Sequence, residues 1–333
     1  MASQFDPGRF NVSTRDHVQT GIQSMLERTH LSGGLSNAID GLHQQQVQWG
    51  IVKESPEFER RMITNPADPC QQFIVTANRR RRDRFSGFGL ATTSLIHEGC
   101  KLCIENIQSR SVLQLTYEFD LAGRRVNALV NPYPNGKDHI TIATREHMRH
   151  HYCGIDEIAE IVTSVATLSR QLPERMVFWH GPGAGMSIDH RHYQVLRRHD
   201  VDEAWPLEKA AAGVLMSGQL QEVEYAISVW ALRNSADSVI PRITRLIGDY
   251  SANSPHASAN IAATCHLGDP RAIDMFCCLR DDRRVTQRLA GAVGTLEVLG
   301  EIVFSSDAEL QRFNSASIVY TELAQILTDA SLR

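Results

Sequence analysis

One stretch, residues 178–195, most constrains how this chain can fold. An apolar, strand-like segment leads through the glycine-rich bend 181–185 into His190-Arg191-His192-Tyr193-Gln194. Residues i and i+2 of an extended chain share a face, so a strand over 190–196 places His190, His192 and Gln194 on one side. Glycines let a backbone approach a ligand closely and expose N–H groups to an anion. The combination suits the handling of a phosphate, although two histidines at this spacing also arise by chance in a chain with 14.

The overall composition is that of a globular protein. The chain has 333 residues, enough for one large or two medium domains, with 42% hydrophobic and 22% charged residues. A net charge of −4 argues against a general nucleic-acid binder. No apolar run reaches the roughly 20 residues of a membrane span, and the first 15 residues lack the apolar core of a signal peptide. We therefore expect a cytoplasmic protein without membrane or nucleic-acid partners.

The hydrophobic patterning predicts an α+β fold. Helices are expected over 15–30 and 36–48 with a break at Gly33-Gly34, and the proline-containing segment 55–72 is expected to be a connection. Later elements follow in chain order: strands 73–76, 112–120, 124–133 and 138–144, a helix from 155 to Pro173, strands 175–180 and 190–196, helices 207–217, 219–233 and 236–249, strands 259–266, 272–280 and 291–304, and helices 307–314 and 316–331. The pattern favours an antiparallel sheet flanked by helices, in two related halves.

Three regions are expected along the chain. Residues 1–72 form an N-terminal helical extension, residues 73–204 hold the histidine motif, and residues 205–333 form a second half without a counterpart of that motif.

The cysteines indicate a metal site rather than disulfides. There are seven, an odd number, in a chain without an export signal. Cys100-x-x-Cys103 suits a zinc site, a redox pair or coincidence. Zinc needs two further ligands, and His147 with His190 would complete a tetrahedral Cys₂His₂ set. His150 and His151 are nearby alternatives, but an exposed helix start explains them better.

Two other segments have a functional and a plain interpretation. The run Asn78-Arg79-Arg80-Arg81-Arg82-Asp83-Arg84 follows a strand, so it is either a solvated loop or a phosphate-binding loop, because guanidinium forks match phosphate oxygens. Asn131-Pro132-Tyr133-Pro134 is either a rigid pocket wall or an ordinary turn.

The order of these motifs resembles the transferase branch of the histidine triad (HIT) superfamily. That branch contains galactose-1-phosphate uridylyltransferase, the diadenosine tetraphosphate phosphorylases and the GDP-hexose phosphorylases. The resemblance rests on C-x-x-C, Asn-Pro-Tyr-Pro, Arg-Glu-His and Gly-x-Gly-Met-Ser-x-x-His-x-His-x-Gln, all within residues 73–200. It extends loosely over 255–310, where residues 290–300 are similar to a late segment of the GDP-hexose phosphorylases.

The resemblance implies roles for the residues of the histidine segment. His192 would be the nucleophile that forms a nucleotidyl-histidine intermediate, with His190 beside it and Gln194 bonded to phosphoryl oxygens. Hydrolases of the superfamily carry a third histidine where this chain has Gln194, so the glutamine favours transfer over release to water. Substrate contacts are implied for the bend and its neighbours: His180, Gly183, Gly185 and Ser187.

The resemblance also implies contacts upstream of the bend. A V-x-x-x-R-x-x-R pattern from Val75 gives Arg79 and Arg82 as phosphate ligands, with Asn78 and Asn131 as further substrate contacts. Cys100, Cys103, His147 and His190 match the zinc ligands of the uridylyltransferases. The implied zinc is structural, since all four positions are filled by protein.

The expected function is that of a nucleotidyltransferase or phosphorylase (EC 2.7.7). Its substrate would be a nucleoside diphosphate sugar or a dinucleoside polyphosphate, and its acceptor inorganic phosphate or a sugar phosphate. A homodimer is expected because relatives are often dimers. The alternatives are a nucleotide hydrolase of the same superfamily and a non-catalytic, nucleotide-binding zinc protein.

Overall fold

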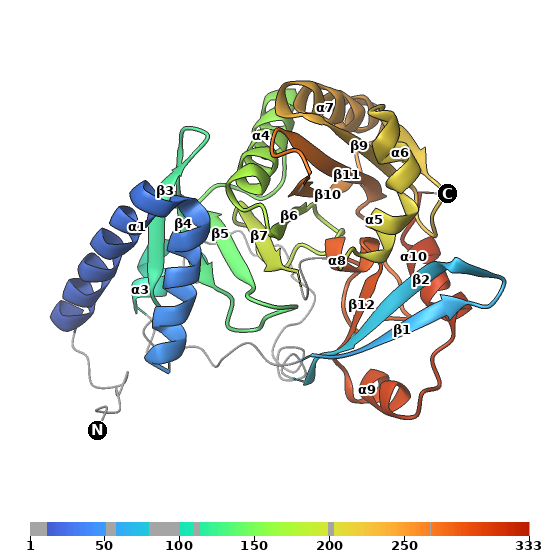
Figure 1. Ribbon diagram of the computed structural model, residues 1–333, viewed down its shortest axis with the longest axis horizontal. Helices are drawn as coiled ribbons and strands as arrows, with labels where there is room; N and C mark the ends of the chain where they lie inside the picture. Colours follow the sequence, from blue (N-terminus) through green and yellow to red (C-terminus); the bar gives the residue numbers. More distant parts are fainter. Residues whose placement is uncertain are drawn as a thin grey trace.

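The structure is a computed structural model that describes residues 12–50, 58–79, 100–109, 114–198, 203–266 and 268–332. Among these residues, nine strands form one antiparallel sheet in the order β3-β4-β5-β7-β6-β10-β11-β9-β8 (Figure 1). The strands are β3 (Thr116–Leu121), β4 (Arg124–Val130), β5 (Ile140–Thr144), β6 (Arg175–His180), β7 (His192–Arg197), β8 (Gln221–Val223), β9 (Val229–Ser235), β10 (Ala257–Cys265) and β11 (Ala272–Asp281). The expected α+β class with a large antiparallel sheet is confirmed.

The sheet is built from a repeated unit. In the first, β4 and β5 are followed by helix α4 (Ile155–Gln171) and then by β6 and β7; in the second, β8 and β9 are followed by α7 (Ala236–Asn253) and then by β10 and β11. Both units have the same spatial order, with the last strand between the second and the third. They join where β6 pairs with β10, and α4 packs beside α7 on one face (Figure 1). The two halves therefore share one continuous sheet.

Alternation along the strands divides the core into two layers. On β7, Tyr193 and Val195 point to the layer beneath the helices, whereas Leu196 belongs to the layer on the opposite face. Helix α4 contributes Ile158, Val162 and other residues at helical spacing to the first layer. Residues on the second face of β7 therefore lie between the large sheet and the C-terminal elements.

The second face is covered by a small sheet and short helices. The small sheet has the order β1-β2-β12, with β1 (Glu59–Asn65) antiparallel and β12 (Glu301–Phe304) parallel to β2 (Asp68–Ala77). The helices are α5 (Pro206–Ala210), α6 (Ala212–Ser217), α8 (Thr295–Val298), α9 (Asp307–Asn314) and α10 (Tyr320–Asp329), and a further short helix, α3 (Ile104–Ser109), lies upstream.

Three sequence-based expectations are wrong. The described part of the expected connection 55–72, residues 58–72, is not a connection, because β1 and β2 form a hairpin whose turn is fixed by Asn65 Oδ1 accepting from Ala67 N at 3.0 Å. Segment 219–233 is not a helix but contains β8 and β9, since pairing with β11 overrides a spacing that suited either structure. The expected strand 291–304 is divided into α8 and β12 by Gly300, whose φ is +93°.

The break at Gly34 is present. Helix α1 (Val12–Gln48) kinks there, at φ +81°, and its two arms lie beside β3 and β4 (Figure 1). The expected division of the chain at residues 72 and 204 stays a prediction.

Glutamines of α1 cover the open edge of the sheet. Gln19 donates to Thr116 O at 2.7 Å and accepts from Thr116 N at 3.1 Å. Gln23 makes the same pair of bonds with Glu118, both at 2.8 Å. Because β3 is an end strand, its outward backbone groups would otherwise offer a template to another chain. The two amides, one helical turn apart, take the place of a neighbouring strand.

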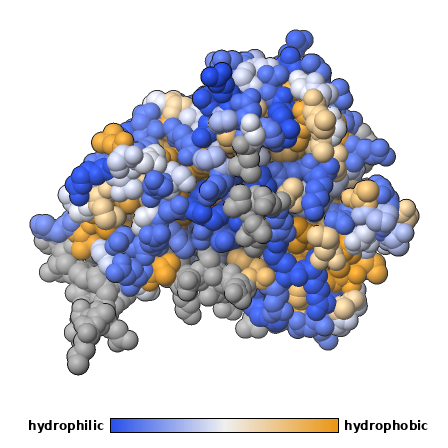
Figure 2. All heavy atoms as spheres, in the orientation of Figure 1, coloured by the Kyte–Doolittle hydropathy of each residue, from blue (hydrophilic) through white to orange (hydrophobic). Residues whose placement is uncertain are grey.

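The exposed surface is mixed. Figure 2 shows a mostly hydrophilic face on which apolar residues form separate small groups. Among the helices of the described residues, none combines the length and apolarity needed to cross a bilayer.

Replacing Gln19 and Gln23 together by alanine is expected to expose the β3 edge. Four hydrogen bonds are lost, and we predict a decrease of about 1–3 kcal/mol in the free energy of unfolding, together with concentration-dependent association in sedimentation velocity. The matched control replaces Gln44 and Gln48, exposed glutamines of the same helix. Equal behaviour of the two double variants would contradict edge protection.

Candidate active site

The cysteine and histidine ligands expected from the sequence come together. The C-x-x-C turn leads into α3, where Asn106 Nδ2 donates to Cys100 O at 2.8 Å. Cys100 Sγ lies 3.4 Å from His190 Nδ1, and Cys103 Sγ lies 3.3 Å from His147 Nδ1. All four ligand atoms of Cys100, Cys103, His147 and His190 are within 4.8 Å of one another. This cluster is able to hold a metal ion.

The environment of the cluster suits a cation with soft ligands. Burial and the neighbouring Cys100 thiol raise the pKa of Cys103 to about 12 without a metal, whereas a bound metal deprotonates a coordinating thiol outright. His190 Nε2 lies 2.8 Å from Thr144 O, so this nitrogen donates and Nδ1 keeps a lone pair toward the sulfurs. Such a bond to the second nitrogen is the usual way in which proteins orient a metal-binding imidazole.

His192 is held by the same residue that completes the cluster. Its Nδ1 lies 2.6 Å from the His190 carbonyl oxygen, which can only accept, so Nδ1 donates. In the neutral ring the lone pair is then on Nε2. His192 is 3% exposed, and β7 places it on the same face as Gln194. The imidazole is thus fixed in the form that can attack an electrophile.

Gln194 is oriented by a histidine that sequence reasoning missed. His139 Nδ1 accepts from Asn135 N at 3.0 Å, so its Nε2 donates to Gln194 Oε1 at 2.9 Å. The amide oxygen is therefore occupied, and the NH₂ group of Gln194 remains as a donor for another acceptor. The sequence showed only that His139 lies at the start of an expected strand, between Asp138 and Ile140. This pattern did not distinguish His139 from any other polar residue at a strand start.

His180, at the end of β6, carries a defined tautomer. Its Nδ1 accepts from Thr295 N at 3.1 Å, and Thr295 Oγ1 lies 3.0 Å from the same nitrogen. The proton is therefore on Nε2. Asn260 Nδ2 donates to Ala184 O at 2.6 Å and to Thr295 Oγ1 at 3.1 Å, which links the glycine bend to the C-terminal half.

The glycine bend depends on two glycines. Gly183 has φ +65°, and a Cβ there would lie 2.4 Å from Asp282 O. Gly185 has φ +105°, and its Cβ would lie 2.7 Å from Gly294 Cα. Neither backbone conformation nor space allows a side chain. Ser187 lies half-buried between this bend and β7.

Of the substrate contacts predicted upstream of the glycine bend, only some lie near His192 and Gln194. Asn131 Nδ2 donates to Thr141 Oγ1 at 3.3 Å, and Thr141 pairs with Gln194 across the sheet. Asn78 is buried and donates to Pro134 O at 2.7 Å. Arg79 is instead half-exposed, with Glu59 at 3.2 Å and Asn314 at 3.2 Å. Arg82 lies outside the described residues.

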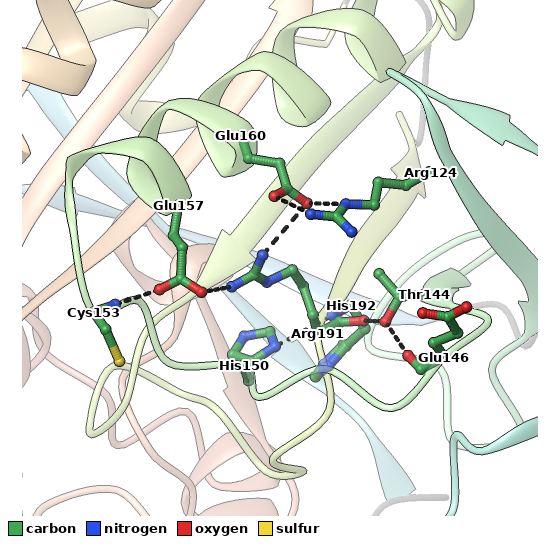
Figure 3. A network of polar contacts seen from close by, with 9 residues as sticks. All are labelled: Arg124, Thr144, Glu146, His150, Cys153, Glu157, Glu160, Arg191 and His192. Carbon is green, nitrogen blue, oxygen red and sulfur yellow. Dashed lines mark hydrogen bonds and ion pairs between the residues drawn. The ribbon is translucent and has the colours of Figure 1, made fainter.

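Arg191 points away from the face of β7 that carries His192 and Gln194. Its side chain is 1% exposed and lies between Glu157 and Glu160 of α4, both at 3.4 Å (Figure 3). Arg124 Nε and Nη2 also donate to the two carboxylate oxygens of Glu160, each at 2.9 Å. This network anchors β7 to α4 on the face opposite Gln194.

His150 is the clearest error of the sequence analysis. It was expected at an exposed helix start, but it is fully buried beside His192 (Figure 3). Burial and the neighbouring His192 lower its pKa well below the ordinary value, so the ring is neutral. His151, in contrast, is exposed as expected.

Two other features of the described residues are weaker candidates for an active site. A hollow of about 620 Å³, lined in part by Met216, Arg233 and Arg271, contains none of the residues above. His256, Asp281 and Asp282 form a second group with metal-type ligand atoms. Asp281 is already bound by Arg283 at 2.6 Å and His256 by Asp282 at 3.0 Å, so the histidine face of β7 remains the candidate site.

A family model described as a domain of unknown function, DUF4922, matches residues 42–197, the span that contains the metal-type cluster and His192. No curated protein sequence matches the chain.

Solved structures resemble the chain over most of its length. Yeast Ap4A phosphorylase Apa2 in complex with AMP is 15% identical, with a TM-score of 0.59 over 88% of this chain and 95% of that one. The same yeast protein in complex with Ap4A gives 14% identity and a TM-score of 0.57, over 88% and 96%. An ADP-glucose phosphorylase from Arabidopsis thaliana is 12% identical, with a TM-score of 0.34 over 83% and 100%. The chain thus has the fold of the yeast phosphorylase, which agrees with the fold that the resemblance implied.

Proposed function

We propose that this chain is a nucleotidyltransferase of the phosphorylase type that acts through a nucleotidyl-His192 intermediate. The observation that carries the proposal is the 2.6 Å bond from His192 Nδ1 to the His190 carbonyl oxygen, which leaves Nε2 as the nucleophilic nitrogen. The substrate is a nucleoside diphosphate sugar or a dinucleoside polyphosphate. The acceptor is inorganic phosphate or a sugar phosphate.

The reaction has two displacements at one phosphorus. Nε2 of His192 attacks the α-phosphorus and forms a P–N bond. The P–O bond between the α-phosphorus and the next phosphate breaks, and the rest of the substrate leaves with that phosphate. In the second step an oxygen of the acceptor attacks the same phosphorus and the P–N bond breaks, which regenerates the neutral imidazole. Dividing one difficult displacement into two easier ones is the advantage of covalent catalysis.

Donors on the same face stabilise the transferring group. Gln194 offers its NH₂, since His139 occupies the oxygen, and His180 offers Nε2–H, since Thr295 occupies Nδ1. Both suit the non-bridging oxygens of a phosphoryl group. The amides at Gly183 and Gly185 lie in the adjoining bend, Ser187 follows the bend, and all three would hold neighbouring phosphates. Asn78, Arg79, Arg82 and Asn131 are proposed as further substrate contacts.

The proposal of a nucleotide substrate is supported by similarity to solved structures. Structures of the same fold were solved in complex with AMP and with Ap4A. A nucleotide is therefore the first substrate class to test.

We further propose that the Cys/His cluster binds one structural zinc ion. Two thiols and two imidazoles are the donor set of tetrahedral zinc sites, in which no position remains for a substrate. When bound, the ion would fix the His190 ring. Because the carbonyl of His190 holds His192 Nδ1, the cluster would also position the nucleophile.

Incubation with an α-phosphorus-labelled nucleotide substrate without phosphate is expected to leave label on the protein. The His192→Ala variant should retain no label and should lose turnover by a factor on the order of 10³ or more, because the attacking atom is absent. His151→Ala, at an exposed histidine of a nearby loop, is the matched control. Full turnover by His192→Ala would refute the proposed mechanism.

Omission of phosphate separates transfer from hydrolysis. We expect turnover of a panel of UDP-, GDP- and ADP-sugars and diadenosine polyphosphates to stop after about one equivalent and to resume when phosphate is added. Product chromatography should then show a nucleoside diphosphate. Continued release of nucleoside monophosphate without phosphate would favour the hydrolase alternative, and binding without any cleavage would favour the non-catalytic one.

Metal analysis tests the cluster. The purified protein is expected to contain about one zinc per chain, and Cys103→Ala about none, because loss of a thiolate opens a tetrahedral site. Cys70→Ala, at an exposed cysteine, is the control. Chelation should lower the unfolding temperature of the wild type but not of Cys103→Ala. Full zinc content in Cys103→Ala would exclude this site.

A further inference from the structure

The strands that carry the two site histidines separate where the site begins. Strands β6 and β7 pair up to Phe178 and Gln194. Two residues further along β6 and two back along β7, the same register would place His180 opposite His192. This pairing is absent from the β6–β7 register, although each strand keeps its outer partner there: His180 pairs with Asn260 of β10, and His192 pairs with Ala143 of β5. We call this opening between His180 and His192 the β6–β7 fork.

The imidazole of His150 lies in this fork. Its Nε2 is 2.6 Å from the carbonyl oxygen of His180, and its Nδ1 is 3.2 Å from the backbone nitrogen of His192. Nδ1 also lies 3.0 Å from the carbonyl oxygen of His190, but a neutral ring has one proton, and the shorter carbonyl contact is at Nε2. The proton is therefore on Nε2, and the lone pair of Nδ1 accepts from the backbone N–H of His192. The imidazole therefore connects the N–H of His192 to the carbonyl of His180, as a direct ladder bond would in an unopened strand pair.

The ring is also fixed from its two faces. Trp179 stacks on it with ring centroids 5.1 Å apart and planes at 17°, and His192 lies at 4.4 Å and 36°. The backbone on both sides of the ring is held as well. His150 N donates to Asp189 Oδ1 at 2.9 Å, and Arg191 N donates to Met148 O at 2.8 Å. The inserted ring is thus held by the segment before α4 and by the approach to β7.

We propose that His150 is a positioning residue that holds the β6–β7 fork open and fixes the backbone and the ring of His192. It acts through His192 and does not itself contact the substrate. One side of the fork leads into the glycine bend and the other into the nucleophile strand, so the width of the fork determines how far the attacking nitrogen lies from the bend.

Three substitutions separate the bonds from the volume of the ring. His150→Phe keeps an aromatic ring in the stack but makes neither bond. His150→Gln has one amide donor and one amide acceptor and can remake both. His151→Ala is the control outside the fork. Zinc content, measured in each variant, monitors the neighbouring cluster.

The direct readout is the ring of His192, recorded as long-range ¹H–¹⁵N correlations of ¹⁵N-histidine-labelled protein and assigned by its loss in His192→Ala. We expect one sharp Nδ1–H tautomer in the wild type, in His151→Ala and in His150→Gln, and an exchanging or mixed tautomer in His150→Phe. If His150→Phe does not fold, His150→Ala with and without added imidazole gives the same comparison, and imidazole should restore the single tautomer.

The kinetic readout rests on the proposed function, whereas the spectrum does not. With phosphorylase substrates, His150→Phe should lower kcat about 10- to 100-fold with KM changed less than about threefold, and His150→Gln should recover kcat to within about threefold of wild type. An unchanged His192 tautomer in His150→Phe, or a tautomer lost equally in His150→Gln, overturns the proposal. An altered tautomer in a protein that turns over none of the substrates instead refutes the proposed function alone.

Discussion

The hydrogen bond from His192 Nδ1 to the His190 carbonyl is the interaction on which the rest of the site depends. It assigns the lone pair to Nε2, and it connects His192, the proposed nucleophile, to a residue whose side chain belongs to the Cys/His cluster. His190 Nε2 is in turn held by Thr144 O of β5. Two adjacent strands and the metal-type cluster therefore converge on the orientation of one imidazole. Precise placement of a reacting group is worth several orders of magnitude in rate, which is why this convergence supports the proposed role of His192.

The two halves of the sheet contribute differently to the candidate site. Both halves contribute the same strand order, and β11 occupies in the second half the place that β7 has in the first. On the corresponding face β11 carries Phe276 and Cys278, both in the apolar layer, rather than imidazole and amide. The second half instead contributes Thr295 and Asn260, which fix His180 and the glycine bend from the opposite side of the β6–β10 junction. One half supplies the proposed nucleophile, His192, and the other supports the groups around it.

The sequence alone predicted the features that depend on residues close together in the chain. The C-x-x-C turn, the histidine strand and the glycine bend are short patterns whose chemistry follows from residue type, and they gave the cluster and the face shared by His192 and Gln194. His150 and His139 could not be found in this way, because their burial and tautomers result from segments distant in the sequence. The spacing of residues 219–233 fitted a helix as well as a strand, and only pairing with β11 decides between them. Arg191 shows the same limit, since α4 supplies the carboxylates that allow its burial.

The central claim is that Nε2 of His192 forms a bond to phosphorus. The most direct test is a crystal structure of the protein trapped with a nucleotide substrate in the absence of phosphate. We predict continuous density between His192 Nε2 and the α-phosphorus, with the Gln194 NH₂ group within hydrogen-bonding distance of a non-bridging oxygen. An intact nucleotide bound away from β7, or phosphorus bonded to a different residue, would contradict the account.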